Sequence, residues 1–320
     1  MEFTDFLEEW HNATPYIVAK TSGSTGAPKT IRLDKDFVRQ SASRTNSFFD
    51  IYSGSHLHSC VAADYIGGKM MAVRADVAGC RFTWEKPSNR PLQGIGSQEN
   101  IDLIAVVPSQ MLHILDNLSS MPSMNAIIIG GSAINHALHD RICNSGLNAY
   151  ETYGMTETSS HIALRKIEAN NGYFETLGGI NVSIDERECL VIGFDSGERF
   201  VTNDIAEVLD SRHFKIKGRF DDVIITGGKK VNPVEVENKL SPYIQKPYVI
   251  TSVPDVKWGS AIVLRIEDPD SPKEDTIDFT SGKDGVLMKT MREILEPHEV
   301  PKKIERMPSL PRTHNGKIIR

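Results

Sequence analysis

A loop rich in glycine and hydroxyl side chains, near the start of the 320-residue chain, has the composition of a phosphate-binding loop. Residues 21–29 read TSGSTGAPK. Glycine lets backbone N–H groups approach an anion closely, serine and threonine add hydroxyl donors, and Lys29 adds a positive charge. The string is not a Walker A loop, because Pro28 precedes the lysine. It is not a nucleophile elbow either, so Ser24 is not expected to attack a substrate covalently. Taken alone, a flexible turn explains the string as well.

A second string combines an aromatic ring, a hydroxyl and a carboxylate at close spacing. Residues 150–158 read YETYGMTET. Tyr153 offers a flat face for a base, Thr156 a hydroxyl for phosphate, and Glu157 a carboxylate suited to a hard cation that bridges phosphates. The alternative is an edge-strand tyrosine followed by a Thr/Glu helix cap.

Four shorter strings contain further polar groups. Residues 130–133 read GGSA after an apolar run, and a plain strand-to-helix turn is the simpler explanation for this string. Residues 202–204 read TND, whose aspartate can accept two hydrogen bonds. Residues 218–222 read GRFDD, which by itself is compatible with a charged surface turn. Residues 310–318 read LPRTHNGKI, whose lysine would ordinarily be a solvated side chain.

Taken in their order along the chain, the strings resemble the motifs of the adenylate-forming superfamily: acyl- and aryl-CoA synthetases, nonribosomal adenylation domains and luciferases. The resemblance runs from Thr21 to Lys317, nearly the whole chain. It implies an enzyme that activates a carboxylic acid with ATP and Mg²⁺ and then transfers the acyl group to coenzyme A. The ATP-binding residues that it implies are Thr21, Ser22, Gly23, Ser24, Thr25, Gly26, Lys29, Gly131, Ser132, Tyr153, Gly154, Thr156, Asp204, Arg219 and Lys317.

The resemblance also implies other roles. The catalytic residues would be Lys317, Thr156 and Glu157, with Glu157 holding the Mg²⁺ and Lys317 reaching both the carboxylate and the α-phosphate. Asp221 would be the hinge between two domains, and Gly228 and Lys230 would bind coenzyme A. Asn203 stands where the family usually has glycine, and asparagine tolerates positive φ better than most residues.

Within the superfamily, the strings YETYGMTETSSHIALRK and GRFDDVIITGGKKVNPVEVE resemble compact o-succinylbenzoate–CoA ligases of menaquinone biosynthesis. Such an acid carries two carboxylates, and the one that is not activated must be held by a basic group, because an unpaired buried charge is costly. In these ligases a Lys or Arg five residues before a glycine has this role. Arg74 has that spacing to Gly79, and Lys69 lies on the same predicted helix. A solvated helix position is the alternative for Arg74.

Other functions remain open at this stage. The chain is also compatible with a general acyl- or aryl-CoA synthetase, or with a stand-alone adenylation enzyme that loads a carrier protein. A non-catalytic nucleotide-binding regulator is the alternative from a different class. The presence of both Glu157 and Lys317 argues against the regulator. Typical superfamily members have a longer region before the phosphate loop, whereas only twenty residues precede it in this chain.

The elements that position these residues alternate along the first two-thirds of the chain. Strands are predicted at 16–19, 59–63, 101–107, 125–129 and 149–153, and helices at 34–52, 67–77, 109–118 and 135–144. Apolar strands separated by helices predict an α/β fold with a parallel sheet. Short alternating runs from about 180 to 217 predict an antiparallel β meander.

The hinge string divides the predicted domains. Residues 1–220 would form the large AMP-binding domain, with its N-terminal part shortened relative to the family. Residues 221–320 would form a small, mobile α+β lid domain that carries Lys317, with helices at 233–240 and 285–295.

Composition limits the partners. A net charge of −6 argues against nucleic acid, because no basic excess is present to neutralise phosphates. The cysteines are widely spaced, so their pattern suggests neither a zinc site nor a disulfide scaffold; they are Cys60, Cys80, Cys143 and Cys189. The opening residues MEFTDFLEEW lack the features of a signal peptide, and no apolar run is long enough to span a bilayer. We therefore expect a cytoplasmic enzyme of small molecules, and a homodimer is left open.

Overall fold

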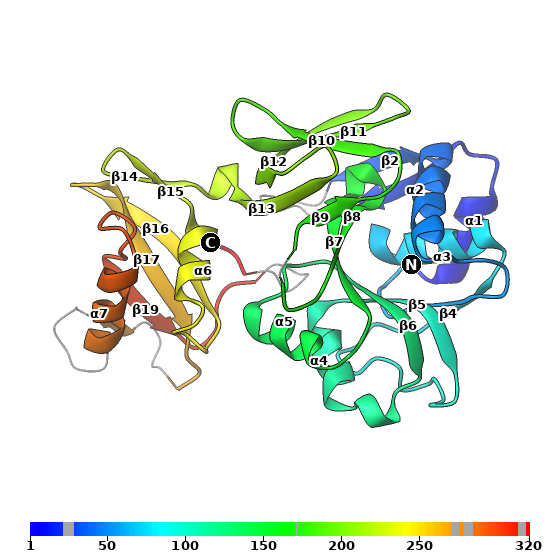
Figure 1. Cartoon of the computed structure of the whole chain (residues 1–320), viewed down its shortest axis with the longest axis horizontal. Helices are drawn as coiled ribbons and strands as arrows, with labels where there is room; N and C mark the ends of the chain where they lie inside the picture. The colour runs from blue at the N-terminus through cyan, green and yellow to red at the C-terminus, as the bar shows by residue number, and fades with distance from the viewer. Residues whose placement is uncertain (22–28, 171, 271–274, 278–283, 313–317) are drawn as a thin grey trace. The chain divides into compact units, whose positions relative to one another are not determined.

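The computed structural model describes residues 1–21, 29–170, 172–270, 275–277, 284–312 and 318–320 (Figure 1). These residues form two compact units. The first unit comprises Met1–Val182, Gly193–Phe200 and Asp210–Phe214, and the second comprises Ser183–Ile192, Val201–Leu209 and Lys215–Arg320. The predicted domain boundary between residues 220 and 221 stays a prediction.

The first unit begins with a layer of three helices and a small sheet. Its elements are α1 (Phe3–His11), β1 (Tyr16–Lys20), β2 (Thr30–Asp34), α2 (Lys35–Phe48) and α3 (Ile66–Ala78). Strands β1 and β2 pair antiparallel, and side chains from all five elements share one apolar core. Helix α2 begins where the Asp34 carboxylate accepts the N–H groups of Asp36 and Phe37, as an N-cap should.

An eleven-stranded mixed sheet follows. Its strands, in chain order, are β3 (His56–Ser59), β4 (Arg81–Trp84), β5 (Asn100–Val106), β6 (Ser123–Ile129), β7 (Ala149–Met155), β8 (Ser160–Lys166), β9 (Phe174–Thr176), β10 (Ile180–Ile184), β11 (Cys189–Phe194), β12 (Arg199–Val208) and β13 (His213–Arg219). The spatial order is β10-β11-β12-β13-β9-β8-β7-β6-β5-β3-β4. Strands β4, β3, β5, β6 and β7 are parallel, and β8 pairs antiparallel with β7.

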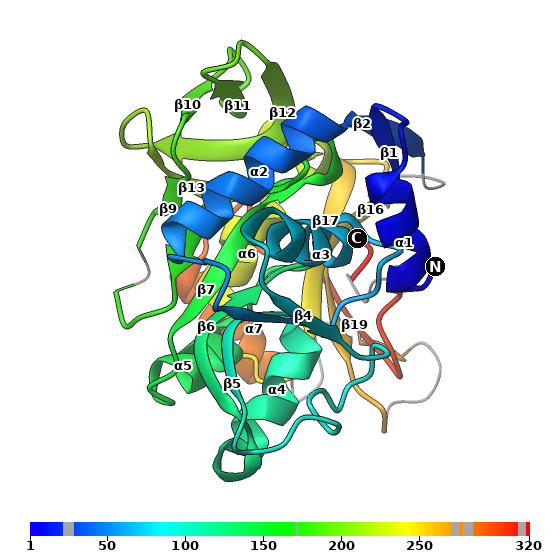
Figure 2. The same ribbon diagram turned by 90° about the vertical axis from the view of Figure 1, so that its right-hand side faces the viewer.

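The strand order reverses direction between β3 and β5. From β3 the chain crosses through α3 to β4 on one side. From β5 it crosses through α4 (Pro108–Asp116) and α5 (His136–Cys143) to β6 and β7 on the other. Because such crossovers are right-handed, α3 covers one face of the sheet and α4 and α5 the opposite face (Figure 2). In sheets of this kind, ligands bind at the carboxyl ends of the strands beside the reversal.

The second unit contains a four-stranded sheet covered by two helices. Its elements from residue 220 on are η3 (Phe220–Asp222), β14 (Ile224–Thr226), β15 (Lys229–Val231), α6 (Pro233–Leu240), β16 (Tyr248–Asp255), β17 (Gly259–Glu267), β18 (Asp275–Ile277), α7 (Asp284–Ile294) and β19 (Lys303–Met307). The sheet order is β16-β17-β19-β18, and β14 pairs with β15. Val236 of α6 and Met291 of α7 share an apolar core with Leu264 and Ile304 of the sheet.

Most predicted elements are confirmed, and the remaining ones are corrected by the structure. The strand predicted at 59–63 is wrong in position, because β3 ends at Ser59 and the chain then turns into α3. The predicted parallel sheet is confirmed for β3, β5, β6 and β7, but the strand predicted at 16–19 lies outside it, as β1 paired antiparallel with β2. The sheet also contains strands that were not predicted, the parallel β4 and the antiparallel β8 and β9. Helix α1 was also missed, although its buried residues Phe3, Phe6 and Trp10 have helical spacing.

The helices of the described residues are short. The longest, α2, has 14 residues, and none is long and apolar enough to cross a membrane.

Candidate functional site

The predicted phosphate loop joins β1 to β2. Its inner residues, Ser22, Gly23, Ser24, Thr25 and Gly26, lie outside the described residues. The two ends of the loop are held together, because the Thr21 N–H donates to the Lys29 carbonyl at 2.8 Å and the Lys29 N–H donates to Thr21 Oγ1 at 3.1 Å. The Lys29 side chain is exposed. The loop therefore starts and ends on one antiparallel pair of strands.

The GGSA string lies at the carboxyl end of β6, next to the end of β7. A side chain at Gly130 would meet Thr152 Oγ1 at 2.7 Å, and Gly131 has a φ of +87°, which favours glycine. Thr152 Oγ1 donates to the Ile129 carbonyl at 3.2 Å. Ser132 is half-buried in the same turn. These contacts bring the GGSA turn and the YGMTET string to one edge of the parallel sheet.

The YGMTET string spans the end of β7 and the short helix η2 (Thr156–Thr158). The Tyr153 ring is half-buried and packs edge-to-face against Phe214, with centroids 5.2 Å apart. Thr156 is half-buried and Glu157 is exposed. Because the Glu157 carboxylate is exposed, it is accessible to a hydrated cation.

Gly154 is required by packing between β7 and β8. A Cβ at this position would lie 2.2 Å from the Ser160 carbonyl oxygen and 2.5 Å from His161 Cα, both backbone atoms. The turn that follows is also constrained, since Ser159 and Ser160 have φ values of 55° and 92°. Non-glycine residues with positive φ are uncommon and concentrate at functional sites.

We predict that Gly154→Ala lowers the free energy of unfolding by roughly 2–3 kcal/mol, because the backbone of β8 must move to admit the methyl group. Urea unfolding would measure the change. Gly96→Ala is the matched control, since a Cβ there meets nothing within 4 Å. Equal unfolding midpoints for the two variants would contradict the packing argument.

Arg74 on α3 is completely buried, with 0% of its surface exposed. The solvated position considered from the sequence is therefore wrong. Its guanidinium donates to Met71 Sδ and to His161 Nδ1, both at 3.5 Å, and no carboxylate among the described residues pairs with it. Burial lowers the pKa of Arg74 to about 9. The group still carries its charge at neutral pH, so the structure buries a cation without a described anion.

His161 connects Arg74 to α2. An arginine N–H can only donate, so His161 Nδ1 accepts and its Nε2–H donates to Thr45 Oγ1 at 3.0 Å. Thr45 in turn donates to the Ser41 carbonyl. The pKa of His161 is well below its ordinary value, first because of burial and then because of Arg74. His161 is therefore neutral and offers Arg74 no counter-charge.

Three buried polar atoms around this cluster lack a hydrogen-bond partner within the described chain: Arg74 Nε, Ser159 Oγ and Asn46 Oδ1. They lie on α3, on the turn after η2 and on α2, and these elements pack together. The Ser41 hydroxyl joins α2 to the turn by donating to the Ser159 carbonyl at 3.0 Å. Buried polar atoms without a partner call for an explanation, which an ordered water or a polar ligand can supply.

Lys69 lies on the same helix but faces α1. Its ammonium is 2% exposed, pairs with Glu9 at 3.3 Å and lies 4.3 Å from the centre of the Phe6 ring. Burial lowers the pKa of Lys69, and Glu9 partly opposes that shift. Its role in substrate binding stays a prediction, but the protein already supplies its counter-charge.

In the second unit, Arg219 joins two predicted site residues. Its guanidinium donates to Asp204 Oδ1 at 3.2 Å and to Asp221 Oδ2 at 3.1 Å. Asn203 Nδ2 also donates to Asp221, at 3.1 Å. Asn203 lies in β12 without a positive φ, so this position does not need glycine. Its amide instead helps to hold the predicted hinge residue.

The predicted coenzyme A residues lie at the β14–β15 turn. Gly228 has a φ of +77°, and Gly228 and Lys230 are both exposed. The catalytic candidate Lys317 lies outside the described residues. The chain on either side of it is anchored, since Arg312 pairs with Glu267 at 3.0 Å and Arg320 pairs with Glu237 at 2.7 Å.

The residues present fit ATP and a divalent cation. The GGSA turn and the half-buried Tyr153 lie at the carboxyl ends of the neighbouring strands β6 and β7, where the two glycines of the turn carry no side chains. The exposed Glu157 offers the hard oxygen ligand that Mg²⁺ prefers. Asp204 offers a carboxylate to a sugar diol, beside Arg219.

Comparisons with known proteins identify the family. The family model "AMP-binding enzyme" matches residues 5–209. A 2-succinylbenzoate–CoA ligase of Lactococcus lactis is 23% identical over 329 residues, covering 95% of this chain and 69% of the relative. A crystal structure of an acyl-CoA synthetase (AMP-forming)/AMP-acid ligase II-like protein from Dyadobacter fermentans is 30% identical, with a TM-score of 0.63, and the match covers 98% of this chain and 90% of that one.

An o-succinylbenzoate–CoA synthetase from Bacillus subtilis shares the fold. Its complex with the acyl-adenylate intermediate has a TM-score of 0.81 at 19% identity, covering 95% of this chain and 67% of that one. Its complex with ATP and a magnesium ion has a TM-score of 0.78 at 19% identity, covering 95% and 68%. From the family match over residues 5–209 and the 30% identity to a synthetase, the chain belongs to the AMP-binding enzyme family and is an adenylate-forming acid–thiol ligase.

Proposed function

We propose that the chain activates one carboxylate of an aromatic dicarboxylic acid, o-succinylbenzoate, with ATP and transfers the acyl group to coenzyme A in the cytoplasm. The observation that carries the choice of acid is Arg74, a completely buried cation with no described carboxylate beside it. An uncompensated buried charge costs several kcal/mol. The second carboxylate of the substrate would remove that cost and give Arg74 Nε a partner.

The location of Arg74 supports the proposal. His161, which Arg74 contacts, lies on β8, and a side chain at Gly154 of β7 would touch the His161 backbone. The same β7–β8 hairpin carries Tyr153 and leads through η2, which holds Glu157. An acid held at Arg74 would therefore be bound by the same hairpin that carries the nucleotide motif.

The proposed reaction has two steps. First, a carboxylate oxygen of the acid attacks the α-phosphorus of ATP, and pyrophosphate leaves. Lys29 and Lys317 would neutralise the charge that develops, and Glu157 would hold Mg²⁺, which supplies further neutralisation. Second, the thiol of coenzyme A attacks the acyl carbon, the thiol proton goes to solvent and AMP leaves with the bond electrons.

Exchange between ATP and labelled pyrophosphate tests the proposal. Among carboxylic acids, o-succinylbenzoate is expected to support the fastest exchange, and added coenzyme A is expected to convert its adenylate to the thioester. Faster exchange with a fatty acid would reject the dicarboxylate. A thioester formed only on a carrier protein would reject coenzyme A as the acceptor.

Asp221 is proposed to be the pivot that exchanges Lys317 for the Gly228 face between the two steps. Asp221→Pro fixes φ at this residue. We expect one half-reaction to survive and the other to be lost, which single-turnover assays of each step would measure. Asp221→Ala removes the contacts with Arg219 and Asn203 but leaves φ free, so it should keep both steps. Unchanged rates in the proline variant would exclude Asp221 as the pivot.

A further inference from the structure

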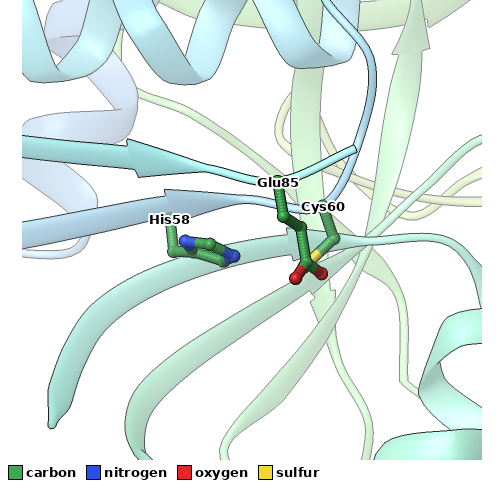
Figure 3. Close-up of side chains that lie close together, drawn as sticks. All are labelled: His58, Cys60 and Glu85. Carbon is green, nitrogen blue, oxygen red and sulfur yellow. The ribbon is translucent and has the colours of Figure 1, made fainter. Parts of the chain in front are cut away.

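A cluster of potential metal ligands lies at the carboxyl ends of β3 and β4, beside the reversal of strand order. It consists of His58 on β3, Cys60 just after β3 and Glu85 just after β4 (Figure 3). One ligand atom from each side chain lies within 4.8 Å of the other two, and no other group of this kind occurs in the described parts of the chain. His58 and Cys60 are fully buried, with 0% exposure, while Glu85 is half-exposed.

The hydrogen bonds around His58 favour the tautomer that carries the proton on Nδ1. The Asn100 carbonyl can only accept, so the Nδ1–H of His56 donates to it at 3.0 Å. In the matching arrangement, His56 Nε2 accepts from the Thr83 hydroxyl at 2.7 Å. Because that hydroxyl proton is used, Thr83 Oγ1 must accept from His58 Nδ1–H at 2.8 Å. His58 Nε2 is therefore left with a bare lone pair.

That lone pair has no hydrogen-bond partner within the described chain, although the atom is buried. The Cys60 thiol does not serve it, because its hydrogen bond is with the Glu85 side chain. Both Glu85 oxygens accept from the single N–H of Leu92, at 2.8 and 3.0 Å. One carboxylate oxygen can leave this N–H while the other keeps it. In Figure 3 the His58 ring is turned toward the Cys60 sulfur and the Glu85 carboxylate.

We propose that His58 Nε2, Cys60 Sγ and one Glu85 oxygen form a binding site for Zn²⁺. Imidazole, thiolate and carboxylate are the ligands that zinc uses in proteins, and three protein ligands leave a fourth position for water. On binding, the thiol releases its proton to solvent as the metal–sulfur bond forms. The charges of Zn²⁺, one thiolate and one carboxylate then add to zero, and a neutral site is the less costly one to bury.

The geometry requires only a small adjustment. Tetrahedral zinc with ordinary bond lengths places its ligand atoms about 3.3–3.6 Å apart, so the three atoms must close by roughly 1 Å. Glu85 is the only partly exposed residue of the three and is therefore the ligand most able to rotate. Thr83, which orients His58 through Nδ1, and the Leu92 N–H, which orients Glu85, provide the outer hydrogen bonds that zinc sites ordinarily have.

Cobalt titration tests the site on the whole metal-free protein. Co²⁺ bound to a thiolate in a tetrahedral site gives a charge-transfer band in the near ultraviolet and d–d bands in the visible. We expect one equivalent to bind and Zn²⁺ to displace it, whereas Mg²⁺ should not. His58→Gln and Cys60→Ala should abolish the bands, and Thr83→Val should weaken binding by roughly 10–100-fold.

Cys143→Ser is the matched control, because the Cys143 sulfur lies 3.6 Å from His139 Nδ1 and offers a competing thiol–imidazole pair. It should leave the bands unchanged. Zinc X-ray absorption of the wild-type protein requires no variant to fold. It should show one sulfur at about 2.3 Å and nitrogen or oxygen at about 2.0 Å. The proposal would be overturned by a zinc coordination shell without sulfur or by the absence of stoichiometric cobalt binding. It would also be overturned if the cobalt bands were lost only in Cys143→Ser.

Discussion

Arg74→Met is expected to lower kcat/KM for o-succinylbenzoate by roughly 10²-fold or more, which corresponds to about 3 kcal/mol for truncating one partner of a buried charge pair. The loss should be mainly in KM for the acid, while KM for ATP changes little. The reason is that the second carboxylate would be buried without the guanidinium that compensates it. Steady-state kinetics with each substrate varied in turn would measure the split. An analogue that lacks the second carboxylate should be affected far less.

The same variant should fold at least as well as the wild type. Arg74 has no described anion in the protein, so methionine removes an uncompensated buried charge and keeps much of the side-chain volume. Urea unfolding without substrate should therefore show an equal or higher free energy of unfolding. Lost activity together with kept stability would separate a binding role from a structural one.

Two controls sharpen this prediction. Arg81→Met removes an exposed arginine that pairs with Glu99 and should leave both kinetics and stability nearly unchanged. Lys69→Met tests the other basic residue of α3, whose counter-charge is Glu9. If Arg74→Met binds the diacid normally, or if only Lys69→Met loses it, Arg74 does not hold the second carboxylate.

Lys317→Ala is expected to slow the adenylation step by 10²–10³-fold, about 3–4 kcal/mol, as the loss of one preorganised charge in a transition state does. Coenzyme A transfer from synthetic acyl-adenylate should keep most of its rate, because Lys317 is assigned to the first step only. Rapid-quench assays of the two half-reactions would measure both rates.

Lys289→Ala is the control, since this lysine is 79% exposed and has no assigned role. It should leave both half-reactions intact. Equal losses in the two half-reactions of Lys317→Ala would show that the lysine acts on the fold or on nucleotide binding in general, and would remove its specific role.

Local sequence predicted the strands and turns that carry the nucleotide strings, because an apolar run marks a strand and glycine marks the turn after it, whereas the roles of the individual residues stay predictions. The strand-to-turn positions of Gly131, Tyr153 and Glu157 follow from the apolar runs before them. Lys317 and the inner phosphate loop stay predictions, since they lie outside the described residues. The pairing of Arg219 with both Asp204 and Asp221 joins residues from neighbouring strings, which spacing alone does not reveal.

The surroundings of Arg74 could be predicted only in part. Helix α3 is buried on almost all sides, so its sequence has no separate polar face. The sequence therefore does not indicate whether the Arg74 side chain points into the protein or toward solvent. The contact with His161 spans 87 residues and depends on the pairing of β7 with β8. No sequence spacing predicts a hydrogen-bond partner at that separation.

The His58 cluster was missed for a related reason. The cysteine pattern suggested no zinc site, because the spacing rule looks for ligands on one or two short segments. Glu85 reaches Cys60 only because β3 and β4 pair in parallel, with Ser59 opposite Trp84. The tautomer of His58 depends on Asn100 of a third strand, β5.

If Arg74 holds the second carboxylate as proposed, binding of the acid also links the lifetime of the protein to its substrate. A ligand that binds only the native state raises the free energy of unfolding, by about 2.7 kcal/mol at 100 times its Kd. Cellular proteases cleave the unfolded population, which shrinks by the same factor of roughly 10². A cell that accumulates the acid would therefore degrade less of this enzyme and, without any change in gene expression, hold more of it.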